Sequence, residues 1–197
     1  MSDKTLLRLE AAGAFIVFIL ASLLHFVYDL SPSVLTSLFG AVNESIWEHI
    51  KIFAFSYLFY AVVEFLWVKP VLKKFTVAKT AGVYVQSIFI PAVYYCYHFF
   101  VGKPVLIIDL LIGFSAATLG FFVSYRLYVS DKEIEKYFYT ALMAIFLLLM
   151  MLFCFTYFPP ETELFRDVVT GTYGVPSESL DMGAFALSEM RNTDVLN

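Results

Sequence analysis

Charged residues are scarce in this chain. They make up 15% of its 197 residues, against about a quarter in an average soluble domain. Apolar residues make up 60%, and the mean hydropathy is +0.79. These values exclude an ordinary soluble domain and indicate a membrane protein that crosses the bilayer several times. The net charge of -4 and the lack of a long basic run also exclude nucleic acid as a partner.

Cysteine is equally rare. The two cysteines, Cys96 and Cys154, lie inside apolar segments and form no CxxC or other metal-binding spacing. We therefore expect both to be small, buried apolar side chains rather than ligands or disulfide partners.

Long apolar runs, in contrast, are abundant. A helix that crosses a membrane needs about 20 mostly apolar residues. Five segments meet this requirement, at residues 9–30, 46–68, 78–101, 104–128 and 136–158. The first is too long for the apolar core of a signal peptide, so we expect it to be retained. Each segment is apolar nearly all round, which predicts an all-α integral membrane protein with five transmembrane helices.

Lysine and arginine residues predict the orientation of these helices, because they are enriched on the cytoplasmic side. If the N-terminus is cytoplasmic, nine of them lie inside: Lys4, Arg8, Lys69, Lys73, Lys74, Lys79, Arg126, Lys132 and Lys136. The other four lie outside: Lys51, Lys103, Arg166 and Arg191. The sequence therefore predicts a protein of the plasma membrane, with a cytoplasmic N-terminus and an extracytoplasmic C-terminus.

The chain is expected to form one domain, residues 1–174, followed by a polar and mobile tail at 175–197. Residues 31–45 connect the first two helices and are half apolar, so we expect a short interfacial or re-entrant segment in the outer half. Pro159 and Pro160 must end the fifth helix. Residues 159–174 then follow as a segment that closes the outer side as a lid.

This topology gathers ionisable side chains at the outer end of the bundle. His25 and Asp29 share one face of the first helix, and all three histidines of the chain lie on this side. The inner half offers only Glu64 and Gln86 at comparable depth. Ionisable groups at membrane depth usually mark a functional site. We therefore predict one polar cavity, facing outward, with candidate residues His25, Asp29, Asn43, Glu44, Glu48, His49, Lys51, Tyr95, Asp109 and Asp167.

Imidazoles combined with carboxylates are typical ligands of zinc and similar divalent ions. The predicted ligands are His25, His49 and Glu44, which would leave a coordination position open for a nucleophilic water. Glu44, Glu48 and Asp109 are the candidates for a catalytic carboxylate acting as general base. The spacing of these residues matches no established metal motif such as HExxH, so the prediction depends on the topology.

Other interpretations of the same residues remain open. Ser45 and Glu48 fit a capping box, in which the Glu48 carboxylate folds back onto the Ser45 amide. Lys51 is predicted to form an ion pair with Glu44 or Glu48. Asp29 is either the residue that orients a His25 ligand or its partner in a buried pair. Asn43, Tyr95 and Asp167 are expected at the rim of the cavity.

Three parts of the chain resemble a known protein family. They are His25 with Tyr28-Asp29, the N-E-S-x-W-E-H-x-K run at residues 43–51, and the run from Phe155 through Pro159-Pro160 to the T-G-T-Y-G of 170–174. The chain resembles a family of small bacterial multi-pass membrane proteins of unknown function, over residues 11–174. In that family Asp-Pro often stands where this chain has Asp167-Val168. The resemblance implies that residues 165–174 belong to the fold, and it implies no activity.

Three functions are compatible with these observations. The first is a metal-dependent hydrolase that acts on a lipid or other small molecule at the outer leaflet. The second is a carrier or receptor for a small cationic or zwitterionic solute, which needs no metal. The third is a non-catalytic membrane assembly subunit, in which the polar residues serve only capping and packing. The sequence leaves open whether the protein is an enzyme.

Overall fold

The computed structural model describes residues 3–176 of the chain. It consists of helices, and its extended pairing is limited to a single bridge between Arg166 and Tyr173. The helices are α1 (Asp3–Leu30), α2 (Val34–Phe39), α3 (Ile46–Val68), α4 (Leu72–Val101), α5 (Leu106–Tyr128), the 3-10 helix η1 (Ile134–Tyr137) and α6 (Phe138–Tyr157). The predicted all-α fold is confirmed.

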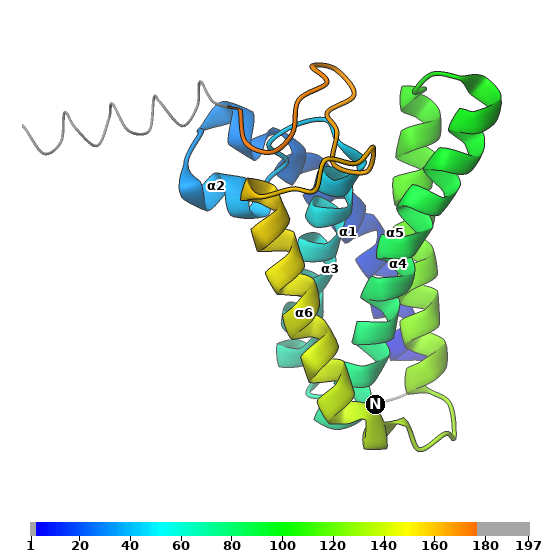
Figure 1. Cartoon of the computed structure of the whole chain (residues 1–197). Helices are drawn as coiled ribbons and strands as arrows, with labels where there is room; N and C mark the ends of the chain where they lie inside the picture. The colour runs from blue at the N-terminus through cyan, green and yellow to red at the C-terminus, as the bar shows by residue number, and fades with distance from the viewer. Residues whose placement is uncertain (1–2, 177–197) are drawn as a thin grey trace, which may run out of the picture.

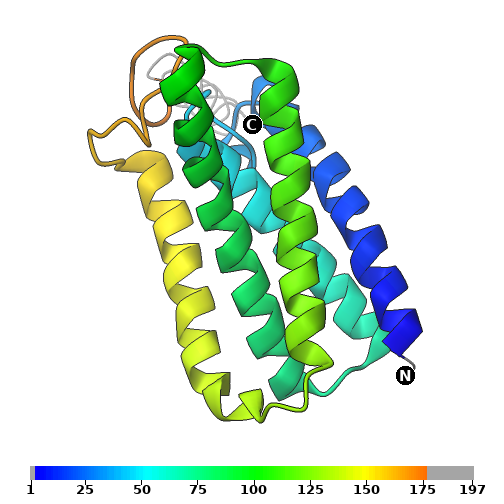
Figure 2. The same cartoon turned by 90° about the vertical axis from the view of Figure 1, so that its right-hand side faces the viewer.

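The five long helices run side by side between two ends of a bundle (Figures 1 and 2). One end, here called the cavity end, holds α2, the turn between α4 and α5, and residues 158–176. The N-terminus and the connections after α3 and α5 lie at the opposite end (Figure 1). α4 packs against α3, α5 and α6, whereas α1 packs against α3 and α5. Residues far apart in the sequence are thereby brought together at the cavity end.

Four helical segments are long and apolar enough to cross a membrane: Thr5–Leu30, Ile46–Val68, Leu106–Tyr128 and Ile134–Tyr157. α4 is 30 residues long but does not belong to this group. It carries three lysines, at positions 73, 74 and 79, together with Gln86 and His98. The finding supports a membrane protein, whereas the count of five spans and the orientation of the termini stay predictions.

Large apolar side chains cover much of the outer surface of the bundle, as expected where helices face lipid. Phe15, Trp67, Phe99 and Phe146 are among them. The two free cysteines, Cys96 and Cys154, are exposed on this surface too, so the prediction that they are buried was wrong. Apolar segments of a membrane helix face outward as well as inward, and their composition does not distinguish the two faces.

Glycines allow α4 and α5 to pack closely in the middle of the bundle. A Cβ atom added at Gly82 would lie 2.6 Å from the carbonyl oxygen of Gly120 and 2.1 Å from the Tyr57 hydroxyl. Such a distance is below any van der Waals contact, so only a residue without a side chain fits there. The backbones of the two helices approach each other as in other membrane bundles with small residues at the interface.

Residues 159–176, here called the C-terminal loop, fold back against the cavity end. The Trp47 amide donates to the Leu164 carbonyl oxygen (3.0 Å), and the Trp47 ring packs on Phe165 with ring centroids 4.9 Å apart. Both aromatic residues are buried. Most of the predicted tail, residues 177–197, lies outside the part of the chain that the structure describes.

Candidate functional site

His25, Glu44 and His49 meet at the cavity end from three different elements. His25 lies near the end of α1, Glu44 in the connection before α3, and His49 in the first turn of α3. The Nε2 atoms of His25 and His49 lie 3.4 Å and 3.8 Å from Oε2 of Glu44. One potential ligand atom from each residue lies within 4.8 Å of the others. A tetrahedral zinc ion holds its ligand atoms about 3.3 Å apart, so small side-chain rotations would close the cluster around an ion.

The two imidazole rings are held differently. Nδ1 of His49 lies 2.8 Å from the Ser45 carbonyl oxygen. A carbonyl only accepts hydrogen bonds, so Nδ1 carries the proton and the neutral ring presents the Nε2 lone pair to Glu44. Nδ1 of His25 is buried without a hydrogen-bond partner. The predicted pairing of His25 with Asp29 is therefore absent, and Asp29 is exposed at the end of α1.

Glu44 is the carboxylate that joins the two histidines. A hydrogen bond from His25 lowers the pKa of the Glu44 carboxyl, and this effect exceeds the opposing effect of burial. The Glu44 side chain remains 43% exposed. It is therefore an ionised carboxylate at neutral pH, and it is accessible from the cavity that it lines.

The cluster forms part of the wall of a cavity of about 560 Å³. Asp109, from the first turn of α5, also lines this cavity. Its carboxylate accepts a hydrogen bond from the Tyr97 hydroxyl. The rest of the lining is mainly apolar: Ile46, Phe53, Ile90, Tyr94, Pro104, Leu106, Ile112, Gly113, Val168 and Val169. Tyr95, predicted at the rim, is exposed, and its neighbour Tyr94 lines the cavity.

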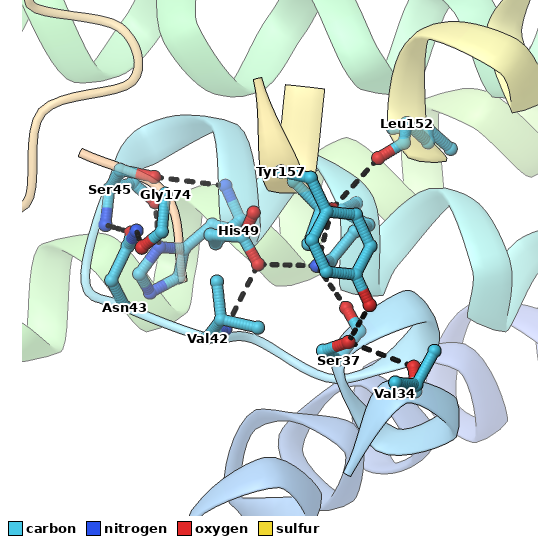
Figure 3. A network of polar contacts seen from close by, with 12 residues as sticks. Val34, Ser37, Val42, Asn43, Ser45, His49, Leu152, Tyr157 and Gly174 are labelled. Carbon is cyan, nitrogen blue, oxygen red and sulfur yellow. Dashed lines mark hydrogen bonds and ion pairs between the residues drawn. The ribbon is translucent and has the colours of Figure 1, made fainter. Parts of the chain in front are cut away.

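Glu48 and Lys51 belong to a buried polar network that is connected to His49 through Ser45. Figure 3 shows this network, with Ser37, Val42 and Ser45 labelled. Both side chains are buried, with Glu48 2% and Lys51 0% exposed. Oε2 of Glu48 lies 2.5 Å from Nζ of Lys51 and accepts from the Val42 amide at 3.0 Å. Lys51 also donates to the Ser37 carbonyl oxygen (2.8 Å) and to Thr156 (3.0 Å). The network joins α2, α3 and α6, and Glu48 is absent from the cavity lining described above.

The start of α3 differs in one respect from a capping box. Ser45 accepts a hydrogen bond from the Glu48 amide at 3.3 Å, as predicted. The return bond from the Ser45 amide goes to Oδ1 of Asn43 (2.9 Å), because the Glu48 carboxylate is engaged by Lys51 and Val42. Of the two partners predicted for Lys51, the structure therefore selects Glu48.

Asn43 and Asp167 position the C-terminal loop over the cavity. Nδ2 of Asn43 donates to the Gly174 carbonyl oxygen at 2.9 Å. The Asp167 side chain accepts from the Val169 amide (2.9 Å) and the Thr170 hydroxyl (2.5 Å), and its carbonyl accepts from the Gly171 amide (2.9 Å). Asp167 thus forms a tight turn, although valine follows it here. The turn presents Val168 and Val169 to the cavity.

The sequence analysis missed a second polar cluster, at the opposite end of the bundle. Nζ of Lys79 lies 2.8 Å from Glu10 and 2.6 Å from Glu64, and all three residues are buried. The prediction that the inner half holds only Glu64 and Gln86 was wrong. α1 and α4 both begin six residues earlier than predicted. Glu10 and Lys79 therefore lie about two turns inside their helices instead of at the very start of the predicted segments.

The model of DUF6512, a family of unknown function, matches residues 4–175 of the chain. The chain belongs to the DUF6512 family. No curated protein and no solved structure matches the chain. Membership in DUF6512 confirms the predicted relation to a family of unknown function, whereas the bacterial origin and the motifs attributed to that family stay predictions.

Proposed function

We propose that this member of DUF6512 is a divalent-metal-dependent hydrolase with its site at the outer leaflet of the plasma membrane. The observation that carries the proposal is the convergence of His25, Glu44 and His49 on one wall of a cavity that also contains Asp109. Two imidazoles and one carboxylate are the ligand set of several catalytic zinc sites, in which a fourth position is left for water. The five-span topology is part of this proposal.

Each side chain has a role in this scheme. His25, His49 and Glu44 would hold the ion, and Ser45 orients His49 through its carbonyl oxygen. A divalent metal held there would supply a water nucleophile near neutral pH. Asp109 acts as the general base: it takes a proton from the attacking water and passes it to the leaving group. Tyr97, hydrogen-bonded to Asp109, fixes the orientation of this carboxylate.

The walls of the cavity indicate the class of substrate. Apart from the histidines and carboxylates the lining is largely aliphatic and aromatic. A volume of about 560 Å³ is in the range of ligand-binding cavities for molecules of drug-like size. We infer an amphiphilic substrate, such as a lipid, with its hydrolysable ester, amide or phosphoester group at the metal and its apolar part along Ile90, Leu106 and Ile112.

The decisive experiment is elemental analysis of full-length protein purified in mild detergent without a histidine tag. We expect near-stoichiometric zinc or another divalent metal in the wild type and its loss in the His25→Ala, His49→Ala double variant. His98→Ala is the matched control, because His98 stacks on Tyr94 and lies outside the cavity lining. Retention of metal in the double variant would refute the proposal.

A second measurement separates metal binding from catalysis. Asp109→Asn should retain the metal and lose most hydrolysis of lipid substrates, because positioned general bases contribute about 10²–10⁴-fold in rate. Loss of metal in this variant would instead make Asp109 a ligand. Unchanged hydrolysis would remove it from the mechanism.

One observation favours a second candidate, binding of a cationic or zwitterionic solute. Two carboxylates, Glu44 and Asp109, and two aromatic rings, Phe53 and Tyr94, line the same cavity. Carboxylates and aromatic faces together recognise ammonium groups. In this case no metal is found in the wild type, and a choline- or amine-type ligand raises the melting temperature of the wild type but not of Asp109→Asn. If neither metal nor ligand binds and the variants lose only stability, the assembly-subunit hypothesis is favoured.

A further inference from the structure

The cluster of Glu10, Glu64 and Lys79, here called the buried triad, lies at the end of the bundle opposite the cavity. It joins three helices, since Glu10 belongs to α1, Glu64 to α3 and Lys79 to α4. Both carboxylates contact the same ammonium nitrogen, at 2.8 Å and 2.6 Å. The side chains of Glu10 and Lys79 are 3% exposed and that of Glu64 is 0% exposed.

Aromatic rings enclose the ammonium group on its remaining sides. Nζ of Lys79 lies 4.7 Å from the ring centroid of Phe121, 5.2 Å from that of Phe75 and 5.6 Å from that of Tyr57. The two tyrosine hydroxyls nearby are directed elsewhere: Tyr60 donates to the Leu9 carbonyl oxygen (2.6 Å) and Tyr57 approaches that of Gly120 (3.5 Å). Neither hydroxyl adds a compensating charge to the triad.

The charges of the triad do not balance. Two carboxylates face one ammonium group, whereas Glu48 and Lys51 at the cavity end form a balanced pair. Ser124, from α5, donates to Oε1 of Glu10 at 3.1 Å. Oε1 of Glu64, however, is buried without any hydrogen-bond partner. An unpaired negative charge in such surroundings is costly, and two carboxylates that share a site disfavour ionisation of both.

Glu10 also borders a second cavity, beside α5. This cavity of about 250 Å³ lies between α1 and α5, and Glu10 is part of its lining with Leu7, Phe15, Phe122 and Tyr125. The other side chains of this lining carry no charge, so the Glu10 carboxyl has no cation to pair with on this side.

We propose that the buried triad is a proton-binding site, which holds one proton shared between the carboxyl groups of Glu10 and Glu64. The proton cancels the excess negative charge and leaves one ionised carboxylate paired with Lys79. The site is separate from the histidine cluster and does not depend on the hydrolase proposal. It gives the chain a protonated carboxyl group inside helices predicted to cross the membrane.

Infrared difference spectroscopy of the full-length protein in sodium-free buffer tests this assignment. We expect the carbonyl band of a protonated carboxyl group at neutral pH in the wild type, with the intensity of one group per chain. Glu10→Gln and Glu64→Gln should each lose the whole band, because the single remaining carboxylate is then balanced by Lys79. Glu163→Gln, which changes an exposed glutamate in the C-terminal loop, should leave the band unchanged.

Three results would overturn the proposal: a wild type without the band, a band that survives both glutamine variants, and a band that disappears when sodium is added. The last result would assign the site to a monovalent cation. If a glutamine variant fails to fold, Glu10→Asp keeps the charge balance and should shift the band frequency. A band at the wild-type frequency in a folded Glu10→Asp protein would contradict sharing by Glu10. Metal analysis of the same samples is independent of all these results.

Discussion

Glu48 and Lys51 form a buried ion pair one turn inside α3, with Oε2 and Nζ 2.5 Å apart. Glu48 also accepts a hydrogen bond from the Val42 amide, and Lys51 donates to the Ser37 carbonyl oxygen and the Thr156 hydroxyl. Buried charges are stable only when their hydrogen-bonding groups are satisfied in this way. The adjacent residue His49 faces the cavity, so one turn of α3 supports both the scaffold and the candidate site.

Lys51→Met should destabilise the protein strongly. The substitution leaves Glu48 as an uncompensated buried charge, which costs about 3–5 kcal/mol when one partner of a buried pair is removed. The double variant Glu48→Gln, Lys51→Met should be more stable than Lys51→Met alone, because the charge is removed with its partner. Unfolding in detergent followed by circular dichroism measures both. Equal stability of the single and double variants would show that the pair is not coupled.

Asn43→Asp should loosen the C-terminal loop without disturbing the start of α3. Aspartate retains an oxygen for the Ser45 amide but cannot donate to the Gly174 carbonyl oxygen. We expect faster amide hydrogen exchange at residues 164–174 and a loss of about 1 kcal/mol in the local opening free energy. Asn43→Ala removes both bonds and should also accelerate exchange in the first turn of α3. Identical exchange in Asn43→Asp and wild type would contradict the role assigned to the Gly174 contact.

Gly82→Ala should separate α4 from α5. The added methyl group would lie 2.6 Å from the backbone of Gly120, which cannot move aside as a flexible side chain can. Overpacking of this kind costs about 1–3 kcal/mol or more. Thr118→Ala is the control, because Thr118 is exposed on α5 and its hydroxyl bonds only within its own helix. A melting temperature of Gly82→Ala equal to that of the control would contradict the close approach of the two helices.

Gln86→Leu should stabilise the protein. The Gln86 side chain is 0% exposed, and neither its amide nitrogen nor its amide oxygen has a hydrogen-bond partner. Leucine has a similar volume and needs no partner, so we expect a gain of about 1–2 kcal/mol in unfolding free energy. Gln86→Glu is the control, because glutamate keeps the shape of glutamine but adds a buried charge. It should be strongly destabilising. A loss of stability in Gln86→Leu would indicate that ordered water satisfies the amide.

The sequence predicted the long helices well where their ends are marked by local signals. α3 spans Ile46–Val68 in both the prediction and the structure, because Ser45 caps its start. α1 and α4 begin six residues before their predicted starts, since charged residues in their first turns were assigned to the flanks. This error hid the buried triad: the inward direction of Glu10 and Lys79 is set by packing between helices, which a single hydropathy profile does not contain.

The candidate site was partly predictable for a related reason. Topology alone placed His25, Glu44 and His49 at one end of the bundle, and the structure brings them together there. The side chains of consecutive helix residues point about 100° apart. Glu48 therefore points into the ion-pair network, whereas the adjacent His49 points into the cavity. The sequence could not assign the two directions, because they depend on where α2 and α6 pack. The contact predicted between Asp29 and His25 was misjudged for the same reason.

The contact of Lys51 with Thr156 has a consequence for biogenesis. Lys51 belongs to the second and Thr156 to the fifth of the long helices in the described part of the chain. The hydrogen bonds of the Glu48–Lys51 pair are therefore complete only after α6 has been synthesised. During insertion, the ammonium of Lys51 and the carboxylate of Glu48 must be accommodated in the translocation machinery without the partner that α6 later supplies. A chain truncated before α6 would present these charges to lipid, and quality-control proteases could recognise them there.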